Sequence, residues 1–148
     1  MELLIENRKA RAENTLLEKF EAGIRLSGSE VKMVRLRRGS LVGSYVRVIQ
    51  GDALLINMQI PPYPFARVED YDPKRTRKLL LHKNEILKLQ HAQDTKGLSL
   101  IPFAVILTKN LIKVQLAIAR GKKLYERRDE LRKRDLQRES EKDLKERQ

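Results

Sequence analysis

The sequence predicts a mainly β protein, built as a small antiparallel barrel with two or three short helices and a C-terminal tail. Three observations support this. Short apolar runs with strand-like alternation recur between residues 15 and 118, tight turns join two pairs of them, and the apolar pattern stops at Gly121. Five or six strands in hairpins favour a closed or partly open barrel, because closure removes exposed edge strands.

Composition narrows the class of protein. The chain has 148 residues and carries 32 Lys+Arg against 20 Asp+Glu, a net charge of +12. So basic a domain attracts polyanions, and nucleic acid is the leading partner class. An anionic membrane is the weaker alternative, since no apolar run approaches the roughly 20 residues of a spanning helix. With no cysteine and two isolated histidines, we expect no disulfide, metal or cofactor, and a cytoplasmic location.

The N-terminal third contains one ambiguous segment, one strand and one helix. Composition leaves open whether residues 2–13 are a solvated terminus. In residues 15–26, apolar side chains from Phe20 onward alternate with polar ones, which predicts a half-buried strand. Ser27 and Glu30 then form a capping box at the start of a helix.

That helix is expected to run through Val34 and to stop at Gly39. Four cations follow its start: Lys32, Arg35, Arg37 and Arg38. Cations near a helix C-terminus are favoured by the helix dipole. Half of this cluster can therefore be structural rather than RNA-binding.

The middle and end of the body predict two hairpins and one helix. Residues 45–49 and 53–57 flank a glycine turn, and residues 99–108 and 112–118 flank Lys109-Asn110. Residues 83–93 have the spacing of a short helix. The oligonucleotide-binding type of barrel is the natural candidate for this arrangement.

Residues 72–82 combine four cations with three leucines. Lys74, Arg75, Arg77 and Lys78 are expected to contact phosphates, which positions RNA without reading its sequence. Leu79 and Leu81 are expected to fix the segment to the barrel. In the preceding proline-rich loop, Tyr63, Phe65 and Tyr71 either stack on bases or anchor the loop, and the sequence leaves both alternatives open.

The composition changes at the tail. We expect a body of residues 1–120 and a basic tail of residues 121–148, which holds 11 Lys/Arg and 8 Asp/Glu but few apolar side chains. Alone, such a segment buries too little surface to remain ordered. It has good helix formers and opposite charges spaced i,i+4, so we expect it to become helical when bound. A solvated, solubilising tail is the alternative.

Six sequence blocks resemble the SsrA-binding protein family, small protein B, which partners transfer-messenger RNA (tmRNA) in bacterial ribosome rescue. The blocks occur in family order from end to end of the chain. They are Glu6-Asn7-Arg8-Lys9-Ala10-Arg11, Phe20-Glu21-Ala22-Gly23-Ile24, Gly28-Ser29-Glu30-Val31-Lys32, Gly43-Ser44-Tyr45, Asp72 to His82, and Ala119-Arg120-Gly121-Lys122-Lys123. Residues 12–15 and the loop 61–71 depart from the family pattern.

The resemblance implies a barrel that clamps the elbow of the tRNA-like half of the RNA, with a tail that enters the decoding centre of a stalled ribosome. It implies RNA contacts by Asn7, Glu21 and Leu80. With the nearby cations, the expected RNA-binding residues are Asn7, Arg8, Lys9, Arg11, Glu21, Lys32, Lys74, Arg75, Arg77, Lys78 and Leu80. The expected ribosome-binding tail residues are Gly121, Lys122, Lys123, Tyr125, Arg127, Arg128, Arg132, Lys133 and Arg134.

Three function classes are open to a basic protein of this kind. The leading hypothesis is a non-catalytic adaptor whose partners are tmRNA, the ribosome and, indirectly, the elongation factor that delivers aminoacylated tRNA, with the protein a monomer in the RNA complex. A structural ribosomal protein with a basic extension is the alternative. An enzyme is not expected, because no nucleophile with a base, converging carboxylates or metal ligands are recognisable in the sequence.

Overall fold

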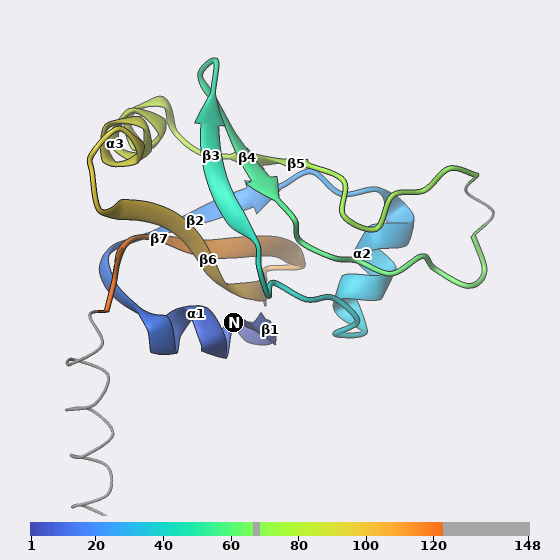
Figure 1. Cartoon of the computed structure of the whole chain (residues 1–148). Helices are drawn as coiled ribbons and strands as arrows, with labels where there is room; N and C mark the ends of the chain where they lie inside the picture. Colours follow the sequence, from blue (N-terminus) through green and yellow to red (C-terminus); the bar gives the residue numbers. More distant parts are fainter. Residues whose placement is uncertain (67–68, 123–148) are drawn as a thin grey trace, which may run out of the picture.

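A computed structural model describes residues 1–66 and 69–122 of the chain. In this part, seven strands form one sheet in the order β1-β6-β7-β2-β5-β4-β3, and every pairing is antiparallel (Figure 1). The elements are β1 (Glu2–Glu6), α1 (Arg8–Glu13), β2 (Asn14–Ile24), α2 (Gly28–Arg35), β3 (Tyr45–Ile49), β4 (Asp52–Ile56), β5 (Arg77–Leu80), α3 (Lys83–Gln93), β6 (Leu98–Thr108) and β7 (Leu111–Gly121). The predicted mainly β fold with short helices is confirmed.

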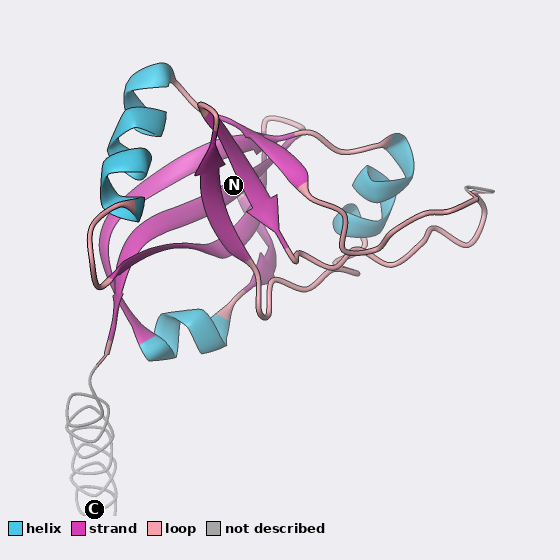
Figure 2. Cartoon of the chain, turned by 45° about the horizontal axis from the view of Figure 1, so that its top comes forward, coloured by secondary structure: helices cyan, strands magenta, loops and turns pink. Residues whose placement is uncertain are grey.

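The sheet curls until its edge strand β3 lies beside β6. Helix α3 packs against both of these strands and covers one end of the barrel (Figure 2). One apolar cluster fills the interior, with contributions from every strand and from α2 and α3. Its fully buried members include Val34, Leu55, Leu79, Leu89 and Leu116.

Both predicted hairpins are present, and each is closed by a two-residue turn. Gln50 and Gly51 connect β3 to β4, while Lys109 and Asn110 connect β6 to β7. All four residues have positive φ, from 49° to 79°. This is the backbone of a type I′ turn, whose twist matches that of the flanking strands. The tight turns set the registers of the two hairpins.

The N-terminus is an ordered part of the sheet, so the solvated terminus that composition left open is ruled out. Strand β1 pairs with β6, with Leu3 opposite Ile106. Leu4 and Ile5 are buried in the core. The sequence could not reveal this strand because its partner lies about 100 residues further along the chain.

The predicted end of α2 at Gly39 is wrong. The helix ends at Arg35, and Arg37 adopts the left-handed conformation with φ 62°. The Arg38 amide donates to the Met33 carbonyl at 3.0 Å and the Arg37 amide to the Val34 carbonyl at 2.9 Å, which is the Schellman motif. Glycine is usual at the Arg37 position, since the left-handed conformation costs other residues about 1–2 kcal/mol.

Two of the three loop aromatics are anchors. The Tyr71 hydroxyl donates to the Ile60 carbonyl at 2.8 Å, and the Tyr63 ring packs on the core. Phe65 is 85% exposed and touches Tyr63 edge-on, with ring centroids 5.4 Å apart. Of the two alternatives for this loop, anchoring therefore describes Tyr63 and Tyr71.

Candidate nucleic-acid interface

The outer surface of three neighbouring strands carries the most distinctive polar pattern of the barrel. We call it the β5–β2–β7 face and define it by Lys19, Glu21, Gly23, Leu80, Lys113 and Gln115. On β2, Phe20 and Ala22 are buried, so Glu21 between them points outward. In the register of the sheet, Glu21 lies opposite Gln115, and Gly23 lies between Leu80 on β5 and Lys113 on β7.

A groove of about 450 Å³ opens along this face, and it brings two predicted RNA-binding residues together. Glu21 and Leu80 both line it, with Leu111, Ile112 and His82 among the other lining residues. Leu80 is 48% exposed while its neighbour Leu79 is buried. An apolar floor beside a free carboxylate is suited to a flat, hydrogen-bonding ligand such as a nucleobase.

Gly23 allows the close approach of β2 and β5 in this groove. A Cβ atom at Gly23 would lie 3.3 Å from the Leu80 Cβ, which is tighter than most contacts of this kind. The glycine therefore lets the Leu80 side chain lie over β2 and form part of the groove floor.

A second hollow continues the face toward α1. It is lined by Arg11, Lys19, Glu21 and Phe103 among others. The Arg11 guanidinium lies 5.0 Å and the Lys19 ammonium 5.7 Å from the centre of the Phe103 ring. The ring holds both cations at the surface, where they can meet phosphates. Because Glu21 lines both hollows, the groove with Leu80 and the hollow with Arg11 and Lys19 form one continuous surface.

Asn7 was expected to contact RNA, and the structure contradicts this. Its side chain is buried, donates to the carbonyls of Leu41 at 3.2 Å and Pro102 at 3.1 Å, and accepts from the Ala10 amide at 3.2 Å. The amide thus caps α1 and ties it to the barrel. Asn7 positions the helix that carries Arg11 but is not available to a ligand.

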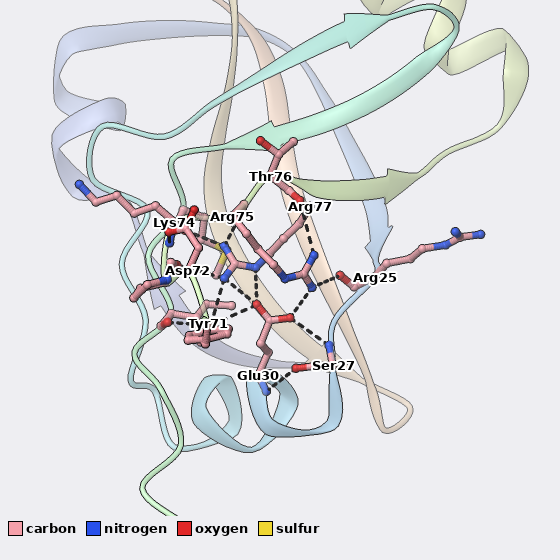
Figure 3. A network of polar contacts seen from close by, with 12 residues as sticks. Arg25, Ser27, Glu30, Tyr71, Asp72, Lys74, Arg75, Thr76 and Arg77 are labelled. Atoms are coloured by element: carbon pink, nitrogen blue, oxygen red, sulfur yellow. Dashed lines mark hydrogen bonds and ion pairs between the residues drawn. The ribbon is translucent and has the colours of Figure 1, made fainter. Parts of the chain in front are cut away.

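Arg77 was also expected at the RNA surface, and this too is wrong. Its guanidinium is fully buried and reaches the Glu30 carboxylate at 2.6 Å, the Met58 carbonyl at 2.6 Å and the Pro73 carbonyl at 3.1 Å (Figure 3). β5 alternates, and Arg77 falls on the inward side with Leu79. The spacing of two residues from Leu79 was a local signal for this burial, but the partner Glu30 is 47 residues away in the sequence and could not be recognised from it.

Glu30 is the centre of this buried network. Its carboxylate accepts from the Ser27 amide at 3.0 Å, which completes the predicted capping box, and it binds the side chains of Arg75 and Arg77. Burial alone raises the pKa of Glu30. The hydrogen bonds from Arg75, Ser27 and Arg77, together with the positive charge of Arg77, outweigh burial and lower the pKa from 4.5 to about 2.

The other predicted cationic residues lie at the surface, and they differ in whether a nearby carboxylate or ring contacts them. Arg8 and Arg11 approach Glu6 at 3.4 and 3.6 Å, and Lys78 approaches Asp52 at 3.3 Å. Lys9 and Lys74 are exposed. The Arg75 side chain is 38% exposed but bound to Glu30, and the Lys32 ammonium lies 5.1 Å from the centre of the Tyr63 ring.

Sequence reasoning missed Lys19, Lys113 and Gln115, which complete the β5–β2–β7 face. A signal for Lys19 was present, because it is two residues from Glu21 and so shares its side of β2. Lys113 and Gln115 are assigned to this face only by the pairing of β7 with β2.

The tail predictions fall almost wholly beyond the described residues. Gly121 is the last residue of β7, and the Lys122 amide donates to the Glu13 carbonyl at 2.8 Å. Lys123, Tyr125, Arg127, Arg128, Arg132, Lys133 and Arg134 lie outside the described part. Residues 1–66 and 69–122 contain no group of three or more His, Asp or Glu placed to hold a metal, and no helix there is long and apolar enough to span a membrane.

Known proteins resemble this chain over most of its length. The SmpB protein family model matches residues 4–146. The SsrA-binding protein of Pelotomaculum thermopropionicum is 47% identical over 147 residues, covering 99% of this chain and 96% of that protein. The SsrA-binding protein of Chlorobium chlorochromatii is 52% identical over 135 residues, covering 90% and 86%. A solved structure described as "tmRNA-SmpB: a journey to the center of the bacterial ribosome" has a TM-score of 0.68 and 42% identity, covering 81% of this chain and 85% of that one.

Proposed function

The chain belongs to the SmpB family of SsrA-binding proteins, and from this premise we propose that it is the RNA-binding adaptor of trans-translation. It binds the tRNA-like domain of tmRNA and delivers that RNA to the A site of stalled ribosomes. The ribosome is rescued and the nascent peptide is tagged for degradation. The protein performs no catalysis of its own and acts in the cytoplasm, where its ribosomal partner is found.

The observation that carries this proposal is the shared groove of Glu21 and Leu80 on the β5–β2–β7 face. Structured RNA is read at unstacked loop nucleotides, whose bases can lie on apolar surface and use their edges for hydrogen bonds. Leu80 supplies the surface. The Glu21 carboxylate accepts from amino groups at a base edge, and its partner Gln115 can both donate and accept.

The cations around the groove bind phosphates and so orient the RNA. Arg11 and Lys19 are held beside the groove by Phe103. The further phosphate contacts proposed are Arg8, Lys9, Lys32, Lys74, Arg75 and Lys78. Asn7 and Arg77 contribute indirectly, by fixing α1 and β5.

The tail is proposed to probe the empty messenger channel and the decoding centre of the small subunit. It starts where β7 ends, beside the end of α1, because the Lys122 amide is hydrogen-bonded to Glu13. The basic and aromatic residues between Gly121 and Arg134 are the proposed ribosome contacts. A structural ribosomal protein is the less favoured function, because the family match runs to residue 146 and includes the tail.

RNA capture tests the proposal directly. The full-length protein is purified with its bound RNA from cells that contain tmRNA, and the RNA is sequenced. We expect strong enrichment of tmRNA. Enrichment of other RNAs in its place, or stoichiometric retention of the protein on ribosomes after a high-salt wash, would contradict the adaptor role.

Truncation separates the body from the tail. The chain should end after Lys122, so that β7 and the bond to Glu13 remain intact. We expect tmRNA binding to persist, while peptide tagging on stalled ribosomes is lost. Loss of RNA binding in a truncated protein that melts like the full-length chain would show that the body and tail do not divide the work in this way.

A further inference from the structure

A second cationic surface lies at the C-terminal end of α2, and the proposed function does not use it. We call it the α2 end cluster and define it by Arg35, Arg37, Arg38 and Lys109. All four residues are exposed. The Arg35 guanidinium donates to the carbonyl of Asn110 at 3.5 Å, so the end of α2 lies against the β6–β7 turn, which also carries Lys109.

The backbone conformation at Arg37 is unfavourable for an arginine. Arg37 occupies the left-handed position of a Schellman motif, with φ 62°, where glycine is the usual residue. Folding gains nothing from a side chain there except an exposed ion pair with Glu2 at 3.0 Å, and such pairs stabilise little. Because the left-handed position disfavours arginine, the presence of Arg37 there indicates that its charge serves a purpose other than folding.

A shallow hollow of about 310 Å³ lies beside the two arginines that follow α2. It is lined by Arg37, Arg38, Gly39, Ser40, Gln59 and Pro61. The floor is rigid, because Ser40 and Gln59 pair through two backbone hydrogen bonds of 2.9 and 3.0 Å. A side chain at Gly39 would force a neighbour to shift, since a Cβ there would lie 2.9 Å from the Ile5 Cδ1. Arg37 and Arg38 both line this hollow, and two neighbouring guanidinium groups are suited to a phosphate.

Little acidic charge opposes the cluster. Glu2 pairs with Arg37. Within residues 1–66 and 69–122, Arg38 and Lys109 form no ion pair with a carboxylate. The dipole of α2 favours a cation at Arg35 in its last turn but not at Arg38, which lies beyond the helix. The positive charges of Arg38 and Lys109 are therefore available to a binding partner.

The cluster continues the β5–β2–β7 face around the β6–β7 turn. Leu111, the residue after the turn, lines the groove of Glu21 and Leu80, while Asn110 contacts Arg35. The cluster also lies far from the end of β7. β7 runs from the turn to Gly121, roughly 35 Å at about 3.3 Å per residue, and α2 and the end of β7 lie at opposite sides of the molecule (Figure 1).

We propose that the α2 end cluster binds the phosphate backbone of structured RNA beyond the groove. The inference rests on the proposed function, because it extends the RNA-binding surface of the β5–β2–β7 face. Two sources can supply the phosphates: a further segment of tmRNA itself, or ribosomal RNA beside the bound complex.

Two cluster variants and one matched control test this in the full-length protein. Arg37→Gly removes a charge and relieves the left-handed backbone, so its melting temperature should equal or exceed that of the wild type. Arg35→Gln/Arg38→Gln removes two exposed charges. The control Arg47→Gln/Lys96→Gln removes two exposed charges that lie outside the cluster, on β3 and after α3.

Binding is measured against purified tmRNA and, separately, by delivery of the preformed RNA complex to purified ribosomes, each over a series of salt concentrations. We expect the double cluster variant to bind one of these targets roughly tenfold more weakly, with a shallower salt dependence, and Arg37→Gly to lose a smaller factor. The control should change by less than about twofold. A loss on tmRNA identifies that RNA as the source, and a loss confined to ribosomes identifies ribosomal RNA.

The inference is overturned if both cluster variants match the control on both targets while the wild type binds normally. It is also overturned if Arg37→Gly melts well below the wild type, because the arginine would then serve the fold. Failure of the wild type to bind tmRNA is a different result, since it contradicts the proposed function and the inference together.

Discussion

Glu21 and Glu30 are nine residues apart, and the protein uses them in opposite ways. Glu21 is exposed on the β5–β2–β7 face, beside the half-exposed Leu80. Glu30 is buried and bound by Arg75 and Arg77, which were themselves expected at the RNA surface. The Glu21 carboxylate is exposed and accessible to a ligand, whereas the Glu30 carboxylate stabilises the fold. The same residue type is therefore an exposed groove residue in one place and a structural residue in the other, and burial distinguishes them.

Arg77→Ala should have the largest effect, because it leaves the buried Glu30 carboxylate without its fully buried partner. Such a deletion costs about 3–5 kcal/mol of the free energy of unfolding. Urea denaturation at neutral pH measures it. The exposed Arg47→Ala is the control, expected within about 0.5 kcal/mol of wild type. Equal free energies of unfolding for the two variants would show that Arg77 stabilises the fold no more than an exposed cation does.

Glu30→Gln should remove a pH-dependent part of the stability. The pKa of Glu30 is about 2 in the folded protein and 4.5 in an ordinary glutamate, so the unfolded chain binds more protons between these values. Stability from this group is complete above about pH 5 and is lost as the pH falls toward 2; it amounts to about 3 kcal/mol. Urea denaturation between pH 2 and 7 should therefore give a flatter profile for the variant. Parallel profiles would contradict the assignment.

Leu80→Ala and Glu21→Gln should show the reverse pattern. Both side chains are at the surface, so the melting temperature should change little. The affinity for tmRNA should fall by about 1–3 kcal/mol, or roughly 5- to 150-fold, because a base contact is lost. Binding titrations at fixed salt measure this. A collapse of the melting temperature with intact affinity in the remaining folded protein would make these residues part of the fold.

Gly23→Ala should give the smallest effect and tests the geometry of the groove. The added Cβ would lie 3.3 Å from the Leu80 Cβ, so the leucine must shift by a few tenths of an ångström. We expect a loss of tmRNA affinity of a few-fold and a stability within about 1 kcal/mol of wild type. Gly28→Ala is the matched control, since no atom lies within 4 Å of a Cβ there. Equal affinity for both would mean that the Leu80 position is not critical.

Local chemistry let the sequence predict several elements correctly. Ser27 and Glu30, three residues apart, exchange the two hydrogen bonds of the capping box. The predicted helix at residues 83–93 matches the observed helix Lys83–Gln93. Tight turns close both predicted hairpins. The family resemblance implied RNA contacts by Glu21 and Leu80; these contacts stay a prediction, and the structure places both residues in one groove. The capping, helix and turn signals each lie within a few residues of the position that they predict, so short segments of the chain contain that information.

The tertiary structure decided which charged and polar side chains are free. Asn7 is satisfied by the carbonyl of Pro102, Arg77 by Glu30, and β1 by β6. In the sequence, these three pairs are separated by 95, 47 and about 100 residues, respectively, so only the closed barrel brings their members together. Lys113 and Gln115 gained a place beside Glu21 in the same way, through the pairing of β7 with β2. The sequence by itself determined most of the strands, the turns and the excess of positive charge. Long-range packing decided which charges remain exposed, because burying a charge is affordable only where a distant partner meets it.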